Sequence, residues 1–109
     1  MTNQSDSIIL IGPMGSGKTS TGRILAKEMG FDFLDTDEEV VERTGVSIAY
    51  IFDVEGETGF RQREHQALIR FLNNDNVVIA TGGGIITHDK SRTIIRAHKR
   101  VVYLKTSIE

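Results

Sequence analysis

Short runs of consecutive apolar residues alternate along the chain with segments of mixed composition. Three of the runs are residues 8–11, 77–80 and 101–104, and residues 33–34 form a shorter one. Short uninterrupted runs rich in β-branched residues are typical of strands buried on both faces of a parallel sheet. We therefore predict four strands at these positions.

The segments between the runs carry helical patterns. We predict a helix over residues 18–29, in which Ile24, Leu25 and Met29 can lie on one face. Further helical segments are expected at residues 38–43, 60–72 and 89–98, with a short turn after a capping Ser47. Strands that alternate with helices indicate an α/β fold, in which helices flank a parallel sheet.

Three polar or glycine-rich segments directly follow predicted strands. They are residues 12–19, 35–37 and 82–84. The carboxyl ends of parallel strands lie at the same edge of a sheet, and ligands of such folds bind there. We therefore expect these three segments to converge on one cleft.

The first of these segments reads Gly-Pro-Met-Gly-Ser-Gly-Lys-Thr, which fits the nucleotide-binding pattern G-x-x-x-x-G-K-[ST]. Its glycines let consecutive backbone N–H groups point at phosphate oxygens, and the helix that follows adds its positive N-terminal end. Lys18 supplies a mobile charge for the β- and γ-phosphates, and Thr19 offers a hydroxyl to Mg²⁺. The motif predicts nucleotide binding but leaves the reaction open.

The second segment holds two carboxylates, Asp35 and Asp37, whose side chains point the same way in an extended stretch. One of them could bind Mg²⁺ through water, and the other could accept the proton of a substrate hydroxyl or orient that hydroxyl. The alternative is structural, because Asp37 precedes two glutamates and suits the N-cap of the next helix. The spacing leaves both interpretations open.

Arg61 and Glu64 lie three residues apart in a predicted helix. As a surface pair they would add about 0.2–0.5 kcal/mol of stability. Alternatively, Arg61 is a fork-shaped cation for a substrate carboxylate, held in place by Glu64. The three glycines at positions 82–84 favour a close approach of the backbone to a ligand, because a plain connection would not need their entropic cost.

Composition excludes several classes of function. The net charge of −2 gives no indication of nucleic-acid or membrane binding, and the absence of cysteine excludes disulfides and thiolate chemistry. The absence of cysteine also fits a cytoplasmic protein, because disulfides are rare in that compartment. His65, His88 and His98 show no metal-ligand spacing and are expected to be solvated. Asp53 and Gly56 match the D-x-x-G of GTPases by accident, because a helical stretch precedes them instead of a strand.

Four segments together resemble the shikimate kinases, a family of P-loop small-molecule kinases. They are GPMGSGKTSTGR at residues 12–23, FLDTDEEV at 33–40, GETGFRQRE at 56–64 and ATGGG at 80–84. Many unrelated proteins share the first segment, whereas the set of four is far more specific. The resemblance implies a P-loop kinase-like fold and an ATP-dependent enzyme that converts shikimate to shikimate 3-phosphate in aromatic amino-acid (chorismate) biosynthesis.

The resemblance also implies roles for single residues. ATP phosphates would be bound by Lys18 and by the backbone amides of Gly15, Ser16, Gly17, Thr19 and Ser20. Mg²⁺ would be bound by Thr19 and, through water, by Asp35. Shikimate would contact Asp37, Arg61, Gly82, Gly83 and Gly84, with Asp37 as the catalytic base.

By the same resemblance, residues 1–109 are the N-terminal part of one kinase domain. We expect the chain to end before a mobile lid with a phosphate-contacting arginine, a second carboxylate-binding arginine, the adenine-contacting loop and a fifth strand. Residues 106–109 would begin a helix capped by Ser107. The complete protein is expected to be a cytoplasmic monomer. Two alternatives stay open, namely a P-loop metabolite kinase of the gluconate type and a nucleotide-binding regulatory module.

Overall fold

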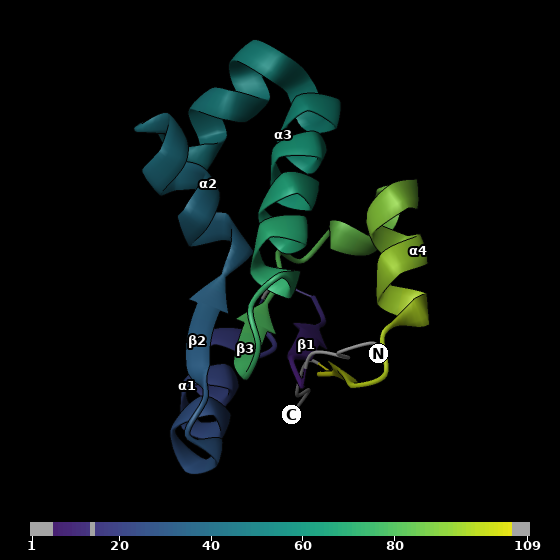
Figure 1. Ribbon diagram of the computed structural model, residues 1–109. Helices are drawn as coiled ribbons and strands as arrows, with labels where there is room; N and C mark the ends of the chain where they lie inside the picture. Colours follow the sequence, from purple (N-terminus) through teal and green to yellow (C-terminus); the bar gives the residue numbers. More distant parts are fainter. Residues whose placement is uncertain (1–5, 14, 106–109) are drawn as a thin grey trace.

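A sheet of four parallel strands forms the centre of the molecule (Figure 1). The computed structural model describes residues 6–13 and 15–105. The strands are β1 (Ile8–Ile11), β2 (Asp32–Asp35), β3 (Val77–Ala80) and β4 (Val101–Tyr103), and their order in the sheet is β2-β3-β1-β4. Every strand overlaps a predicted run, so the prediction of a parallel α/β fold is confirmed.

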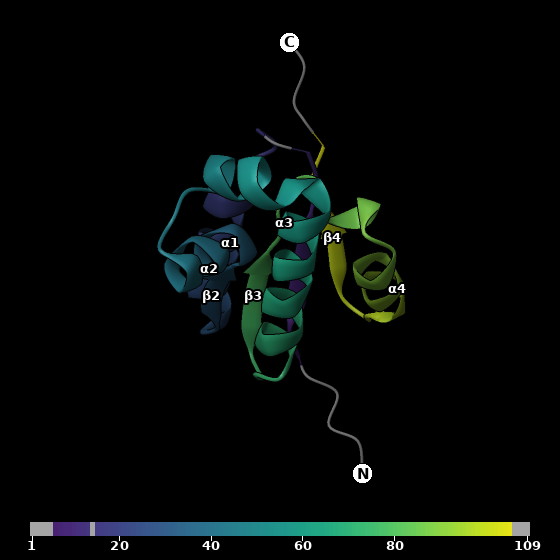
Figure 2. The same cartoon turned by 90° about the horizontal axis from the view of Figure 1, so that it is seen from above.

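Helices cover both faces of this sheet. They are α1 (Lys18–Met29), α2 (Thr36–Thr44), α3 (Ile48–Leu72) and α4 (Asp89–Ala97), with a 3₁₀ turn, η1 (Ile85–Thr87). In β1, Ile8 and Leu10 pack with Ala26 of α1, whereas Ile9 packs with Leu68 of α3 and with the apolar side of α4. The pleat of the strand thus separates two cores, with α1 on one face and α3 and α4 on the other (Figure 2).

The buried face of α1 differs from the prediction. Its buried residues are Gly22 and Ala26, whereas Ile24 is 63% exposed and Met29 is exposed as well. A Cβ atom at Gly22 would collide with the ring of Phe33. Small residues face the sheet because the helix packs closely against it. Of the three apolar residues predicted to share a face, Leu25 packs against this core, whereas Ile24 and Met29 do not.

α3 consists of two helical parts that meet at a kink, in agreement with the short turn and the separate helix that the sequence predicted. Ser47 caps it as expected, accepting a hydrogen bond from the Tyr50 N–H at 3.1 Å. Gly56 interrupts it with φ 75° and ψ 177°, a conformation that glycine adopts most readily. The kink lets the two parts of α3 run in different directions (Figure 1). The helix predicted to begin at residues 106–109, with Ser107 as its cap, lies outside the described residues.

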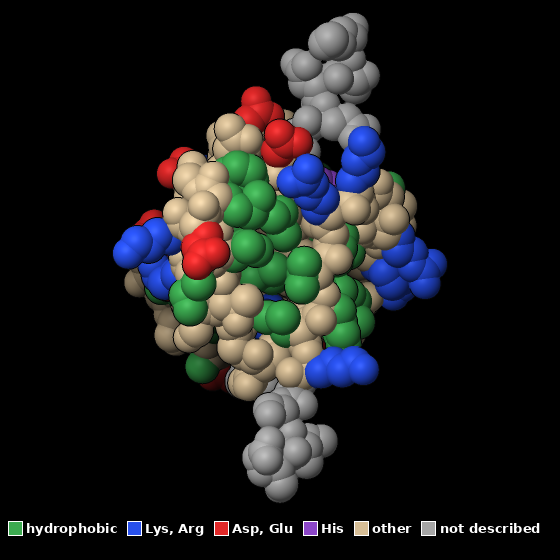
Figure 3. Space-filling view, turned by 90° about the horizontal axis from the view of Figure 1, so that it is seen from below, with side chains coloured by type: hydrophobic (Ala, Val, Ile, Leu, Met, Phe, Trp, Pro, Cys, Tyr) green, Lys and Arg blue, Asp and Glu red, His purple; other side chains and the backbone are tan. Residues whose placement is uncertain are grey.

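Part of the surface is apolar. Hydrophobic side chains gather near the middle of the face seen from below, and Lys and Arg side chains lie toward its edges (Figure 3). Large exposed apolar residues of the chain include Ile24, Val102 and Tyr103. Within the described ranges, no helix combines the length and the apolar character needed to cross a membrane.

Candidate active site

The three segments predicted to converge line one cavity of about 220 Å³. The lining residues are Gly15, Gly17, Lys18, Thr19, Ser20, Asp35, Asp37, Ala80, Thr81 and Gly83. The parallel register explains this convergence, because it sets Leu10 of β1 and Asp35 of β2 on either side of Ala80 at the end of β3. The prediction of a single cleft is confirmed.

The phosphate loop, residues 12–19, leads from β1 into α1. Gly15 and Gly17 have φ values of 82° and 88°, in the left-handed region that favours glycine. Gly17 is the N-cap of α1, and no side chain caps this helix end. The first N–H groups of α1 therefore lack a side-chain acceptor, which makes this helix end suited to a bound anion.

Lys18 turns its ammonium group back over the phosphate loop. Its Nζ donates hydrogen bonds to the carbonyl oxygens of Gly12 and Pro13, the second at 2.9 Å. Burial lowers the pKa of Lys18, and the carboxylates of Asp37, Asp35 and Glu64 oppose this shift. A bound phosphate would give the ammonium a charged acceptor in place of two neutral carbonyl oxygens.

Asp35, and not Asp37, is the N-cap of α2. Its Oδ1 accepts hydrogen bonds from the N–H groups of Asp37 at 2.8 Å and Glu38 at 3.2 Å. The capping role predicted for Asp37 is wrong because Asp35 has the extended backbone that a cap requires, while Asp37 already lies in the first helical turn. The Asp37 side chain therefore remains available to line the cavity.

Thr19 and Asp35 fit the requirements of a Mg²⁺ ion. The Thr19 hydroxyl donates to Asp35 Oδ2 at 3.4 Å, so two oxygen ligands of the kind that Mg²⁺ prefers lie side by side at the phosphate loop. Within residues 6–13 and 15–105, no group of three or more His, Cys, Asp or Glu side chains could hold a metal. A Mg²⁺ ion here would therefore need water and nucleotide phosphates as its other ligands.

Asp37 carries a buried oxygen that is left without a partner. Its Oδ1 makes no hydrogen bond within the described part of the chain. Burial raises the pKa of Asp37 to about 6; the charges of Glu64 and Asp35 also raise it, while Arg61 and Lys18 lower it. Unsatisfied buried acceptors are uncommon and costly, so this one is a candidate for contact with a ligand.

Glu64 lies at the centre of a cluster that we call the buried network, formed by Thr36, Arg61, Glu64 and Gly82. Glu64 is 0% exposed. Its Oε1 accepts from Arg61 Nη1 at 3.0 Å, and its Oε2 accepts from the Gly82 N–H at 2.8 Å and the Thr36 hydroxyl at 3.3 Å. Burial raises the pKa of Glu64, and Arg61 is the main opposing influence. Arg61 and Glu64 are therefore not the surface pair that their spacing allowed.

The buried network holds Arg61 in a defined position. The Arg61 side chain is 15% exposed, and its guanidinium lies 5.2 Å from the centroid of the Phe60 ring. Arg61 Nε lies 3.5 Å from Glu57 Oε2. A guanidinium fixed at Nη1 by Glu64 has further N–H donors of the kind that pair with a carboxylate.

The glycine run after β3 provides space as well as backbone. A Cβ atom at Gly82 would collide with Glu64 Oε2 and would lie 2.7 Å from Asp37 Oδ1. A Cβ atom at Gly84 would collide with the Arg61 guanidinium. The sequence suggested that these glycines let the backbone approach a ligand, and the structure adds that two of them make room for protein side chains.

Several side chains outside the cavity correct the sequence interpretation. The three histidines were expected to be solvated, but His65 is 7% exposed and its Nδ1 lies 2.8 Å from Ser91 Oγ. His88 Nε2 is a buried atom, and His98 Nε2 lies 2.8 Å from the carbonyl oxygen of Ser7. These rings fill spaces between elements that are distant in sequence, which helical spacing does not show.

Two further observations concern short sequence patterns. Asp53 and Gly56 lie within α3, so the D-x-x-G match is accidental, as expected. Thr36 was not foreseen as a site residue, because its role depends on contacts with residues 28 and 46 positions away. The one available signal was its position between the two aspartates.

Comparison with known proteins gives consistent results over nearly the whole chain. A family model described as Shikimate kinase matches residues 14–109. A shikimate kinase of Pseudomonas paraeruginosa is 52% identical over 103 residues, which cover 94% of this chain and 60% of that protein. A shikimate kinase of Legionella pneumophila is 47% identical over 103 residues, which cover 94% of this chain and 59% of that protein.

Solved structures agree with these relatives. Shikimate kinase from Acinetobacter baumannii in complex with shikimate has a TM-score of 0.89 at 46% identity, covering 94% of this chain and 57% of that one. Shikimate kinase from Aquifex aeolicus has a TM-score of 0.84 at 37% identity, covering 94% and 60%. The chain spans about 60% of the length of the relatives that it matches. By sequence and by structure, this chain belongs to the shikimate kinase family.

Proposed function

We propose that the whole protein transfers the γ-phosphoryl group of ATP to the 3-hydroxyl of shikimate, giving shikimate 3-phosphate in the chorismate pathway. Residues 1–109 are the N-terminal part of its kinase domain and supply the phosphate site and much of the substrate-binding region. The proposal includes a cytoplasmic, monomeric protein. The observation that carries it is the buried Oδ1 of Asp37, which has no hydrogen-bond partner among the described residues; the Asp37 side chain lines the phosphate-loop cavity and feels the charge of the Arg61 that Glu64 holds.

The nucleotide binds at the phosphate loop. The backbone amides of Gly15 to Ser20 and the N-terminal end of α1 bind its phosphate oxygens. Lys18 leaves the carbonyl oxygens of Gly12 and Pro13 and contacts the β- and γ-phosphates. Mg²⁺ would be held by the Thr19 hydroxyl and, through water, by the Asp35 carboxylate, and would neutralise charge on the phosphates.

The acceptor binds on the other side of Asp37. Arg61 forms a bidentate pair with the shikimate carboxylate, while the backbone at Gly82 to Gly84 borders the ring. Asp37 accepts the proton of the attacking hydroxyl. At the same time the hydroxyl oxygen bonds to the γ-phosphorus, and the bond from that phosphorus to ADP breaks. With a pKa of about 6, most Asp37 side chains are ionised at pH 7 and ready to take that proton.

Relatives support the choice of substrate. The Acinetobacter baumannii shikimate kinase was solved in complex with shikimate, and it superimposes on this chain with a TM-score of 0.89. The residues proposed to bind a carboxylate and a hydroxyl in this chain match the two groups that such a substrate offers. An acid with a hydroxyl near its carboxylate needs both a fixed cation and a proton acceptor.

Steady-state kinetics of two variants of the whole protein test the proposal. Asp37→Asn should lower kcat by about 100-fold or more, because an amide cannot take the proton. Arg61→Lys should mainly raise the KM for shikimate, by roughly tenfold, because lysine cannot form the bidentate pair. If Asp37→Asn leaves kcat unchanged and weakens binding alone, the base role is wrong. If the unmodified whole protein does not phosphorylate shikimate, the proposed substrate is wrong.

A further inference from the structure

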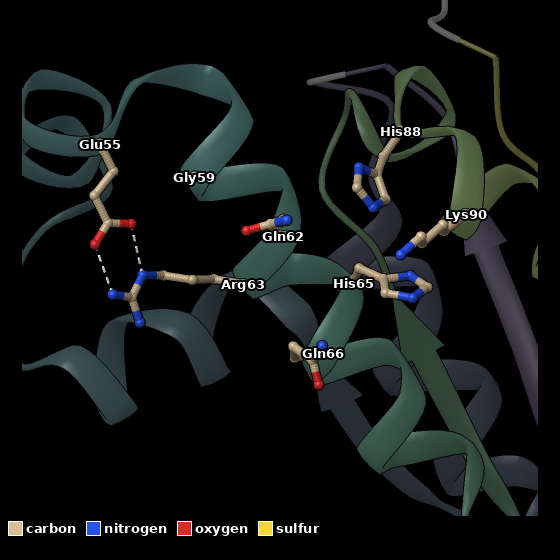
Figure 4. A pocket seen from close by; sticks show the side chains of 8 residues that line it. All are labelled: Glu55, Gly59, Gln62, Arg63, His65, Gln66, His88 and Lys90. Atoms are coloured by element: carbon tan, nitrogen blue, oxygen red, sulfur yellow. Dashed lines mark hydrogen bonds and ion pairs between the residues drawn. The ribbon is translucent and has the colours of Figure 1, made fainter.

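A second cavity, of about 480 Å³, lies between α3 and the start of α4. It shares no lining residue with the candidate active site. The lining residues are Glu55, Gly59, Gln62, Arg63, His65, Gln66, His88 and Lys90 (Figure 4). Its volume falls within the range of roughly 300–1,000 Å³ that is usual for small-molecule sites.

Positively charged and hydrogen-bond-donating groups gather on one side of this cavity. The rings of His65 and His88 lie with their centroids 5.1 Å apart, and Figure 4 shows the Lys90 amine directed toward both rings. His88 Nε2 is buried and has no hydrogen-bond partner within the described residues. His88 is also the N-cap of α4, and no side-chain hydrogen bond caps this helix. Two imidazoles and an ammonium thus line one space, beside a helix N-terminus that has no side-chain cap.

Nearby carboxylates do not neutralise this cluster. Glu55, the only carboxylate that lines the cavity among the described residues, binds Arg63 with distances of 2.8 and 2.6 Å. Asp89 in the first turn of α4 accepts from Arg92 Nη2 at 2.6 Å. No ion pair of Lys90 is found within residues 6–13 and 15–105. The cluster therefore lacks a counter-charge.

Electrostatic repulsion within the cluster also favours an anion as the ligand. Burial lowers the pKa of His65, and the positive charges of His88 and Lys90 lower it further. A bound anion would relieve this repulsion and would favour the protonated imidazoles as hydrogen-bond donors. A cation would instead add to the repulsion from Lys90, and the two imidazoles have no third metal-binding side chain beside them in the described part of the chain.

We propose that this cavity binds a small phosphate dianion, either inorganic phosphate or the phosphate group of a phosphomonoester. His65, His88 and Lys90 contact the phosphate oxygens together with the N-terminal N–H groups of α4. The amide side chains of Gln62 and Gln66 line the remaining space and suit a polar remainder of the ligand. Such a ligand would link α3, which carries Arg61 and Glu64, to α4.

Nuclear magnetic resonance of the whole protein with labelled histidine tests this assignment. Inorganic phosphate at constant ionic strength should move the imidazole signals of His65 and His88 along one saturable curve, with a Kd near or below about 1 mM. The Lys18→Ala variant should give the same curve, because the site is separate from the phosphate loop. Glycerol 3-phosphate distinguishes the two possible ligands, with uncharged glycerol as the control. Tighter binding of this ester than of inorganic phosphate indicates that the natural ligand is a phosphomonoester.

A matched pair of lysine variants provides the control. Lys90→Gln should weaken phosphate binding by about fivefold or more through loss of one charged donor, whereas Lys99→Gln, an exposed lysine outside the cavity, should not. Phosphate also stabilises proteins without a specific site, so the difference in thermal shift between these two variants is the second readout. The assignment is wrong if phosphate gives no saturable shift, if both variants bind alike, or if zinc moves the histidine signals and phosphate does not.

Discussion

The phosphate loop and the buried network both hold charged side chains, but the contacts of these side chains differ in burial and in sequence separation. In the phosphate loop, Lys18 donates to the carbonyl oxygens of Gly12 and Pro13 among the described residues, and Thr19 is exposed. In the buried network, Glu64 is fully buried and bound by groups from α2, α3 and the end of β3. One region holds its charges loosely through contacts between near neighbours in the chain, and the other fixes them through distant contacts.

This difference indicates a division of labour within one site. A nucleotide brings its own large charge, so the residues that meet it need freedom to reorganise around the phosphates. A small carboxylate substrate brings less binding energy, so its partner Arg61 gains from being positioned in advance. Substitutions should therefore affect activity alone in the phosphate loop, and both stability and activity in the buried network.

The largest effect on activity is expected for Lys18→Ala. Loss of the ammonium at the transferring phosphate should lower kcat/KM in the whole protein by about 100-fold or more. The unfolding free energy should change by less than about 1 kcal/mol, because the side chain is partly exposed and its hydrogen bonds go to neutral carbonyl oxygens. Coupled assays and urea denaturation measure the two quantities, with Lys27→Ala in the last turn of α1 as the control. Activity within a few-fold of wild type would contradict the assignment of residues 12–19 as the loop that binds the nucleotide phosphates.

The largest effect on stability is expected for Glu64→Ala. This change leaves Arg61, Thr36 and the Gly82 N–H without their buried partner, and should cost about 3–5 kcal/mol in urea denaturation. The matched control is Glu57→Ala, which removes a carboxylate that also lies beside Arg61 but is 60% exposed. It should cost at most about 1 kcal/mol. Equal losses in the two variants would mean that the buried network does not hold the fold together.

The same contrast explains how much the sequence could predict. The phosphate loop is contiguous, so its glycines, Lys18 and Thr19 can be recognised from the order of residues alone, together with their chemistry. The buried network depends on which residues meet after folding. Spacing left Arg61 and Glu64 open between a surface pair and a site, and it gave no reason to single out Thr36.

The two aspartates show a different kind of error. Both Asp35 and Asp37 suit a helix N-cap by residue type, and the boundary of α2 decides which one caps it. A helix that begins at Thr36, two residues before the predicted start, makes Asp35 the cap. Helix boundaries are the least certain part of a sequence pattern. The roles predicted for the pair therefore depended on a boundary that the sequence alone did not determine.

A smaller effect is expected for Gly84→Ala, which tests the position of Arg61. Gly84 has φ −106°, which alanine adopts without strain, but the new Cβ would meet the Arg61 guanidinium. We expect the KM for shikimate to rise by roughly tenfold with a smaller change in kcat, because Arg61 must turn away from Glu64. In an Arg61→Ala background the same change should have almost no further effect, which a double-mutant cycle measures. Additive effects in that cycle would show that Gly84 acts through another contact.

The smallest expected effect is a gain of stability in Asp37→Asn that depends on pH. The pKa of Asp37 in the folded protein is about 6, above the ordinary 3.8, because burial disfavours the ionised form. Between these two values the folded state binds more protons than the unfolded state, so stability falls as pH rises from about 4 to 6 and stays lowered above that. Asparagine removes this cost, so the variant should gain stability on the order of 1 kcal/mol at pH 8, and this gain should disappear near pH 4. The full pKa shift would correspond to about 3 kcal/mol, but solvent near the side chain reduces the effect. Urea denaturation at both pH values measures the gain, with Asp53→Asn as the exposed control, expected to stay within about 0.5 kcal/mol of wild type. A loss of stability at pH 8 would mean that favourable contacts hold the Asp37 carboxylate in place, and that its position is not strained for catalysis.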